Sequence, residues 1–212
     1  MILIAIDGTA ASGKGTLGKS IAMRLKLDYL DTGKLYRAVG AEVLAAGKSA
    51  DSLTPTEIAD IAARLSLPLK NENHLNSADI ATQASIVAAI PDVRSALLSK
   101  QRDFANHPPS GNGAILDGRD IGTVILPDAP IKIFVDAKPE IRATRRHLEM
   151  QARGMNAIYG EVLADLIERD GRDKNRTTAP LTAAKDAFFI DSSALSAQEV
   201  LHMALNYIES QS

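Results

Sequence analysis

The sequence contains no cysteine, which excludes disulfide bonds, catalysis by a thiolate and zinc sites with cysteine ligands. Its four histidines lie far apart along the chain and lack the spacing of metal ligands. Basic residues are not in excess either, since 24 Lys and Arg stand against 26 Asp and Glu, giving a formal net charge of −2. A protein with this balance has no overall positive field to attract nucleic acid, so we expect no nucleic-acid partner.

Long hydrophobic runs are also absent. Residues 1–6 are apolar, but they are too few for a signal peptide or a membrane span, and they lack a basic leader. We therefore expect a soluble, cytoplasmic protein that is a monomer and has no membrane partner. With 212 residues, of which 45% are hydrophobic, the chain can form one sizeable core and a small inserted lobe.

The most informative stretch is a glycine-rich turn between an apolar run and a helical pattern. The run at residues 2–6 ends at Asp7, and the turn that follows carries the P-loop pattern G-x-x-x-x-G-K. Gly8 and Gly13 allow backbone angles that a Cβ would forbid. Successive N–H groups can then point into one concavity at the positive end of the next helix, and Lys14 adds a mobile charge. The pattern predicts a polyphosphate site.

One position departs from the strict pattern, which has Ser or Thr directly after the lysine. Here Gly15 intervenes and the hydroxyl comes at Thr16, which leaves two roles open for Thr16, magnesium ligation or phosphate contact. Asp117 closes an apolar run and stands where a Walker B carboxylate would, so it could order the water around magnesium. We expect no direct metal ligand, and Mg²⁺ near Thr16 and Asp117 through water.

Apolar runs alternate with helical patterns along the chain, which predicts an α/β fold with a parallel sheet covered by helices on both faces. Five strands are countable, and the ligand crevice should lie beyond their carboxyl ends. We divide the chain into a core of residues 1–47 and 108–212 and an insertion of residues 48–107. A helix pair that breaks near Gly154 predicts a lid at about residues 145–160 within the core.

Three groups of charged residues bear on a second substrate. The first is Arg37, just inside a helix that begins at a strand end, and the second is the segment at residues 117–120. The third is Arg169, Asp173 and Arg176, spaced i, i+4, i+7 on one helical face. For each group the alternative is a surface salt pair. That alternative is strongest for the third group, because several acidic residues are close to it in sequence.

Together these motifs resemble the bacterial cytidylate kinase family, one of the nucleoside monophosphate kinases among the P-loop proteins. The resemblance covers nearly the whole chain. Five motifs carry it in the right order: I-D-G-x-x-x-S-G-K-G-T at residues 6–16, D-T-G-x-x-Y-R at 31–37, A-S-x-V-A-A-x-P-x-V-R at 84–94, D-G-R-D-I-G-T-V-I-x-P-D-A at 117–129, and E-R-D-x-R-D-x-N-R at 168–176.

The resemblance implies a P-loop kinase fold with a small, mostly helical NMP-binding insertion and a helical lid. It also implies that ATP, with Mg²⁺, phosphorylates CMP to CDP, and dCMP to dCDP. ATP would bind to Gly8, Thr9, Ala10, Ala11, Ser12, Gly13, Lys14, Gly15 and Thr16. CMP would contact Thr32, Tyr36, Arg37, Ser85, Arg94, Asp117, Arg119, Asp120, Arg169, Asp173 and Arg176. Catalytic roles would fall to Lys14, Arg37, Arg119 and Arg176.

Within the CMP site, the resemblance assigns Arg37, Arg119 and Arg176 to the phosphate, Arg169 and Asp173 to the ribose, and Ser85, Arg94 and Asp120 to the base. The chemistry of cytosine fits the last assignment. Its amino group can donate to Asp120 and Ser85, while its N3 and O2 can accept from Arg94. Uracil would leave two buried groups mismatched, at a cost of about 1–3 kcal/mol each. Adenine has a similar edge, so pocket size must exclude it.

The chain departs from the family pattern in three places. Thr9 stands where Pro is usual, and Asn76 stands where Arg is common. Between residues 69 and 75 there is no room for the hairpin region of many relatives, so we expect a reduced lobe. Within the lid, Arg145 and Arg153 are the candidates for an arginine that reaches the substrates.

Two other functions remain open at this level. A related small kinase, for UMP or another phosphorylated acceptor, would share the P-loop and the lid. A nucleotide-dependent binding switch would instead need a guanine-reading N-K-x-D motif on a late strand, and residues 191–193 carry none.

Overall fold

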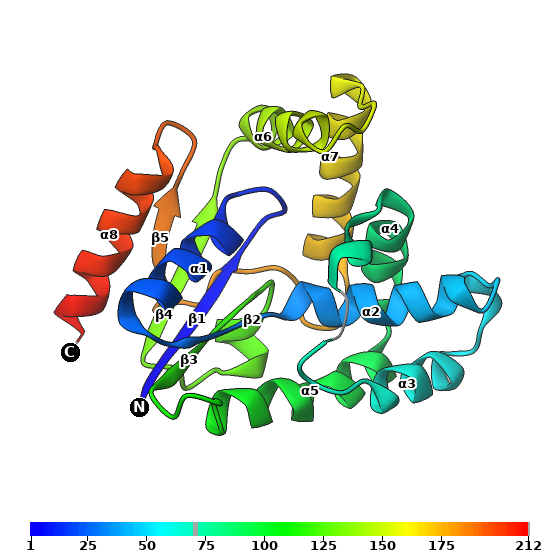
Figure 1. The fold of residues 1–212 in the computed structure, drawn as a ribbon, viewed down its shortest axis with the longest axis horizontal. Coiled ribbons are helices and arrows are strands. Elements are labelled where there is room, and N and C mark those ends of the chain that lie inside the picture. The colour runs from blue at the N-terminus through cyan, green and yellow to red at the C-terminus, as the bar shows by residue number, and fades with distance from the viewer. Residues whose placement is uncertain (70–71, 212) are drawn as a thin grey trace.

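The computed structural model describes residues 1–69 and 72–211, and its centre is a parallel sheet with helices on both faces (Figure 1). The five strands are β1 (Ile2–Gly8), β2 (Asp28–Asp31), β3 (Gly113–Gly118), β4 (Ile131–Asp136) and β5 (Phe188–Asp191). They lie in the order β2-β3-β1-β4-β5, and all four pairings are parallel. The predicted five-stranded parallel sheet is confirmed.

Helices connect successive strands, as a parallel sheet requires. The α-helices are α1 (Lys14–Leu25), α2 (Thr32–Ala45), α3 (Pro55–Arg64), α4 (Ala78–Val87), α5 (Pro91–Asn106), α6 (Pro139–Ala152), α7 (Tyr159–Asn175) and α8 (Ala197–Ser210). Short helical turns are η1 (Ala50–Ser52), η2 (Glu72–Asn76) and the π-helix η3 (Ile121–Ile125). No helix in the described ranges is long and apolar enough to cross a membrane.

Alternation along the strands divides the core into two layers. Ile4 and Ile6 of β1 pack with α1 and α8, whereas Ala5 between them belongs to the cluster under α2 and α5. On β3, Ile115 packs in the same cluster as Ile4 and Ile6, and Leu116 packs in the same cluster as Ala5. Because β1 and β3 are buried on both faces, each contains an unbroken apolar run before its aspartate, at residues 2–6 and 114–116.

In the part of residues 48–107 that the structure describes, the regular elements are all helices, joined by turns, with α4 packed on α2 and α5 packed on α3 (Figure 1). Helix α3 begins with a reciprocal capping box, in which the Thr54 hydroxyl accepts from the Glu57 N–H while the Glu57 carboxylate accepts from the Thr54 N–H. The lobe thus has the helical character that the sequence predicts. Its role as an NMP-binding insertion stays a prediction.

Helices α6 and α7 lie side by side above the carboxyl end of the sheet (Figure 1). The chain turns between them at Gly154, whose φ of +72° is in the left-handed region. A buried ion pair joins the two helices, because a guanidinium nitrogen of Arg142 lies 2.6 Å from Oδ2 of Asp170. The helix pair includes the segment at about residues 145–160 for which the sequence predicts a lid, and its role as a lid stays a prediction.

Candidate functional site

The glycine-rich loop depends on backbone positions that only glycine tolerates. Gly8 has a φ of +153°, and a Cβ there would lie 2.0 Å from the carbonyl oxygen of Val135 on β4. Gly13, the N-cap of α1, has a φ of +94°. Lys14 therefore starts the helix immediately after the loop, at the positive end of the helix dipole. This is the strand-loop-helix arrangement that the sequence predicts.

The loop is held from outside by residues of α6 and by residues at the carboxyl ends of β4 and β5. The Ala10 carbonyl accepts from Arg142 at 3.2 Å, and the Ser12 carbonyl accepts from the Ser192 hydroxyl at 2.9 Å. Thr9 donates to Oδ1 of Asp136 at 2.6 Å, so its side chain is turned toward β4. Gly8 and Thr9 line neither of the two cavities beside the loop, whereas residues 10 to 16 line one or both.

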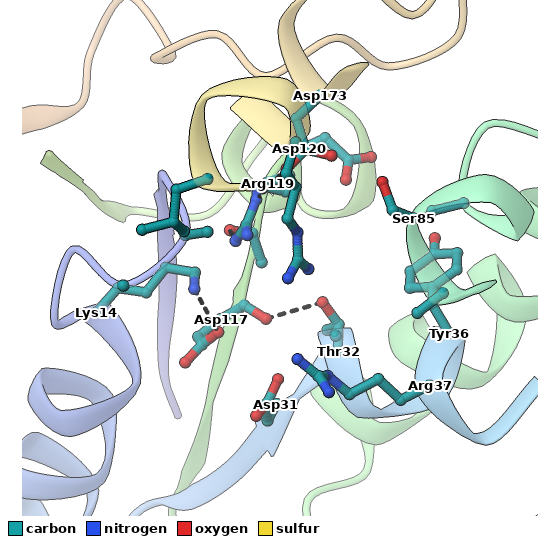
Figure 2. A pocket seen from close by; sticks show the side chains of 18 of the residues that line it. Lys14, Asp31, Thr32, Tyr36, Arg37, Ser85, Asp117, Arg119, Asp120 and Asp173 are labelled. Atoms are coloured by element: carbon teal, nitrogen blue, oxygen red, sulfur yellow. Dashed lines mark hydrogen bonds and ion pairs between the residues drawn. The ribbon is translucent and has the colours of Figure 1, made fainter. Parts of the chain in front are cut away.

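The first cavity brings together all of the residues predicted to contact CMP. They come from α2, α4, α5, β3, the turn after β3, and α7 with its C-terminal end. In Figure 2, Lys14, Arg37 and Arg119 extend toward the same space, while Tyr36 and Ser85 line its far end. The second cavity is lined by the P-loop, the first turns of α1 and α8, and α6, and it contains Thr16.

Asp117 lines the first cavity and faces Lys14, which lines both cavities. Oδ1 of Asp117 is 3.8 Å from Nζ of Lys14, and its backbone carbonyl accepts from the Thr32 hydroxyl at 2.8 Å (Figure 2). Its Oδ2 accepts from the Tyr29 hydroxyl at 2.5 Å. Burial raises the pKa of Asp117, and the charge of Lys14 opposes that rise. Asp31 lies beside Asp117 in the register of β2 and β3, so both carboxylates are at the carboxyl edge of the sheet.

Positive charge dominates the first cavity. Seven cationic side chains line it against five carboxylates. The cations are Lys14, Arg37, Arg94, Arg119, Arg146, Arg169 and Arg176, and the carboxylates are Asp31, Asp117, Asp120, Glu149 and Asp173. An anion in this space would offset the excess, so the cavity suits a phosphorylated ligand.

Burial, and after it the charge of neighbouring arginines, lowers the pKa of three of these arginines. Burial and then the neighbouring charge of Arg119 lower the pKa of Arg169 to about 10. Burial also lowers the pKa of Arg37, with Arg146 adding to the effect, and that of Arg176, with Arg94 adding to it. Nε of Arg169 is buried without a hydrogen-bond partner among the described residues. These groups are poorly satisfied by the protein alone, which favours a bound anion.

The group at the end of α7 differs from its predicted geometry in one respect. The helix ends at Asn175, and Arg176 is an extended C-cap residue, so Arg176 does not continue the helical face. It is nevertheless brought close to Asp120, at 3.6 Å, and to Asp173, at 3.9 Å. The surface-pair alternative is wrong for Asp173, because this residue is buried and accepts from Nε of Arg119 at 2.7 Å.

The three residues predicted to read cytosine line the same cavity. Arg94 and Asp120 form a buried ion pair, and Arg94 also donates to the Ala88 carbonyl at 3.1 Å. The Arg94 guanidinium lies over the Tyr36 ring, 5.6 Å from its centroid. The Ser85 hydroxyl accepts from Arg172 at 3.1 Å.

Sequence reasoning missed three residues near the site. One is Arg172, whose ready partner in sequence, Glu168, also pairs with it in the fold. The others are Arg146 and Glu149 of α6, which line both cavities. The signal for Arg146 was present as an arginine-rich stretch, but periodicity alone does not say which arginine turns inward.

Of the two lid candidates, Arg145 donates to the carbonyl of Ser192 at 2.6 Å and lines the second cavity. Arg153 pairs with Glu149 at 2.6 Å on the surface, and it lines neither of the two cavities. The structure therefore favours Arg145, and with it Arg146, over Arg153.

Comparison with known proteins bears on the whole chain. The family model for cytidylate kinase matches residues 4–210. The cytidylate kinase of Paramagnetospirillum magneticum is 50% identical over 213 residues, which cover 99% of this chain and 98% of that protein. That of Azorhizobium caulinodans is 52% identical over 208 residues, covering 98% of each. That of Rhodospirillum rubrum is 49% identical over 213 residues, covering 100% of this chain and 99% of that protein.

Solved structures support the fold at much lower identity. A gluconokinase from Sinorhizobium meliloti 1021 has a TM-score of 0.50 at 16% identity, covering 99% of this chain and 92% of its own. An uncharacterized protein from Eubacterium ventriosum has a TM-score of 0.57 at 15% identity, covering 99% of both chains. Together with the sheet order, these likenesses confirm the α/β P-loop kinase fold and say nothing of the substrate.

Proposed function

The chain belongs to the cytidylate kinase family, and on this premise we propose that it transfers the terminal phosphate of ATP to CMP between the two cavities described above. ATP would occupy the P-loop cavity, and CMP would occupy the cationic one. The observation that carries the proposal is the excess of guanidinium groups in a cavity next to a phosphate-binding loop, with Asp117 of that cavity facing Lys14 of the loop.

The chemistry needs little from a general base, because the acceptor oxygen belongs to a phosphate that is already anionic. Catalysis would consist of positioning and charge neutralisation. Lys14 would follow the transferring phosphate, and Arg119 would offset charge on its equatorial oxygens with help from Arg37 and Arg176. The ion pair between Arg119 and Asp173 orients that guanidinium before the substrate binds. The lid would exclude water and suppress hydrolysis of ATP.

The oxygen groups of Thr16 and Asp117 are suited to holding Mg²⁺. Mg²⁺ in phosphate-transfer sites keeps several waters and takes few protein ligands. The Thr16 hydroxyl and the buried Asp117 carboxylate are oxygen groups on the two sides of Lys14, and no cluster of three metal-ligating side chains occurs in residues 1–69 and 72–211. Thr16 and Asp117 would hold the ion through water, and the ion would neutralise charge on the phosphates of ATP.

For base recognition, we assign Ser85, Arg94 and Asp120 to cytosine. The ion pair between Arg94 and Asp120 places a donor and an acceptor next to each other, which is the arrangement that the N3 and N4 edge of cytosine requires. Arg169 and Asp173 would lie near the ribose, and dCMP would also be accepted. The monomeric state and the cytoplasmic location expected from the sequence stay predictions.

A competition assay with CMP, UMP and AMP tests the substrate, using the wild type beside Arg94→Met and Asp120→Ala. We expect the wild type to prefer CMP, and each variant to lose at least about fivefold of its preference for CMP over UMP, since one mismatched buried group is worth roughly 1–3 kcal/mol. The KM for ATP should change little, because neither residue lines the P-loop cavity.

Arg64→Met and Asp128→Ala are matched controls, because both residues are exposed and lie outside both cavities. They should keep the wild-type preference. A wild-type preference for AMP would contradict the proposed function, and ATP hydrolysis that does not respond to CMP would favour the binding switch instead.

A further inference from the structure

Tyr29 has no role in the site as assigned above, yet its hydroxyl makes a short hydrogen bond to one of the site's carboxylates. The hydroxyl donates to Oδ2 of Asp117 at 2.5 Å, and the other oxygen of the same carboxylate lies 3.8 Å from Nζ of Lys14. The carboxylate is thus held between a hydroxyl from β2 and the P-loop lysine. Tyr29 lies 88 residues away from Asp117 in the chain.

The position of this hydroxyl coincides with the one departure of the loop from the strict P-loop pattern. Gly15 stands where that pattern has Ser or Thr. A Cβ on Gly15 would lie 3.3 Å from Oδ2 of Asp117 and 3.5 Å from the Tyr29 hydroxyl oxygen. A serine or threonine side chain at this position would therefore reach the same carboxylate oxygen that Tyr29 now contacts.

A second glycine supports the same arrangement. Gly18 follows Gly15 by three residues, so both lie on one face of α1. A Cβ on Gly18 would come within 2.7 Å of Cε2 of Tyr29, which is closer than a real side chain could approach. The two glycines leave a slot on α1, and the tyrosine ring lies in it. The slot is required by the ring rather than by backbone angles, because neither glycine has a positive φ.

We propose that Tyr29 is a positioning residue that supplies, from β2, the hydroxyl that a strict P-loop places directly after its lysine. It fixes the Asp117 carboxylate so that one oxygen accepts from tyrosine while the other faces Lys14 and the nucleotide. The inference rests on the proposed function, in which Asp117 holds the magnesium of ATP through water. Tyr29 touches neither substrate and acts through Asp117.

The test compares the wild type with Tyr29→Phe, which keeps the ring and removes only the hydroxyl. We expect kcat for CMP to fall about tenfold, with the KM for CMP within about twofold of the wild type. Calorimetric titration of ADP with and without Mg²⁺ gives a readout besides activity. The gain in ADP affinity on adding Mg²⁺ should shrink about fivefold, and ADP binding without Mg²⁺ should be unchanged.

Tyr207→Phe is the matched control, because Tyr207 stacks on Phe188 and lies outside both cavities. It should behave as the wild type in both measurements. The double variant Gly15→Ser with Tyr29→Phe is the rescue, since it restores a hydroxyl beside the same carboxylate oxygen. We expect it to recover about half or more of the lost magnesium-dependent gain, which a purely structural loss would not allow.

If Tyr29→Phe keeps the wild-type kcat and the wild-type magnesium gain, the inference is wrong. It is equally wrong if kcat falls but the magnesium gain does not, or if the double variant recovers nothing. A wild type that does not phosphorylate CMP would overturn the proposed function instead, and the calorimetric comparison would still decide the role of Tyr29.

Discussion

At the scale of single residues, the site depends on which carboxylate each arginine contacts. Asp173 accepts a hydrogen bond from Nε of Arg119 and lies near Arg176. Asp120 forms an ion pair with Arg94. Each buried carboxylate thus offsets part of the cationic charge and leaves the remainder for a ligand. Removing one of these carboxylates would leave buried positive charge without compensation, which is costly in a protein interior.

The variant Asp173→Asn tests whether a buried carboxylate of the site contributes to the free energy of unfolding. Burial acts to raise the pKa of Asp173, but Arg119 and Arg169 outweigh it and hold the pKa below its ordinary value. Because the folded pKa lies below the unfolded one, the carboxylate stabilises the fold above about pH 4, and this stabilisation is lost as pH falls through the folded pKa. We expect the variant to lose about 3 kcal/mol of unfolding free energy at pH 7.

Urea denaturation at a series of pH values measures this. The difference between wild type and Asp173→Asn should be largest at neutral pH and should narrow as the pH is lowered below 4. The control is Asp165→Asn, on the exposed side of the same helix, which should differ little from the wild type at any pH. A difference that is constant with pH would show that the charge of Asp173 does not stabilise the fold.

At the scale of elements, helices α6 and α7 are tied to the P-loop by the side chain of Arg142. Arg142 of α6 pairs with Asp170 of α7, and it also donates to the carbonyls of Ala10 in the loop and Ala137 after β4. This one guanidinium therefore holds four segments together. If α6 and α7 act as the predicted lid, its closure would have to involve the ends of the two helices that lie away from Arg142.

Arg142→Met should cost about 3–5 kcal/mol of unfolding free energy, because it leaves Asp170 buried without its partner. Adding Asp170→Asn should cost less than the sum of the two single changes, since the unpaired charge is then gone. Thermal or chemical denaturation of the four proteins of this cycle measures the coupling. The exposed pair of Arg153 and Glu149 is the reference, and Arg153→Met should cost no more than about 1 kcal/mol. Equal losses of unfolding free energy for Arg142→Met and Arg153→Met would show that the contacts of Arg142 do not stabilise the fold more than an exposed ion pair does.

At the scale of the whole molecule, the chain is slightly acidic, yet its first cavity is cationic. The positive charges come from segments far apart in sequence and are collected at the carboxyl edge of the sheet. The five carboxylates of the cavity offset only part of this charge, and acidic side chains outnumber basic ones in the rest of the chain. Attraction of an anion is therefore a property of the cavity rather than of the molecule's net charge.

Stabilisation of the fold by CMP should depend on the phosphate group of the ligand. CMP at about one hundred times its Kd should stabilise the fold by about 2.7 kcal/mol, whereas cytidine at the same concentration should do far less. The shift in Tm measures both, and added salt should weaken CMP because it screens the guanidinium charges. Cytidine is the control, since it keeps the base and the ribose. Equal shifts with the two ligands would show that the cationic cluster does not hold the phosphate.

The sequence by itself determined the features that depend on neighbours in the chain. The strands follow from apolar runs, α3 and α8 begin at capping boxes read directly from Thr54 and Ser196, and the loop follows from its glycines. These features are local, because backbone angles, caps and the alternation of side chains involve residues only a few positions apart. The five motifs also determined the family.

Tertiary structure alone decided the pairings within the site. It set Arg94 against Asp120, made Arg176 a C-cap residue, turned Arg146 inward and Arg153 outward, and brought Tyr29 to Asp117. Each of these pairings joins elements that meet only when the sheet is assembled, or depends on which side of a helix faces the core. An arginine has many acidic residues within reach in sequence, and only packing selects the one that it contacts.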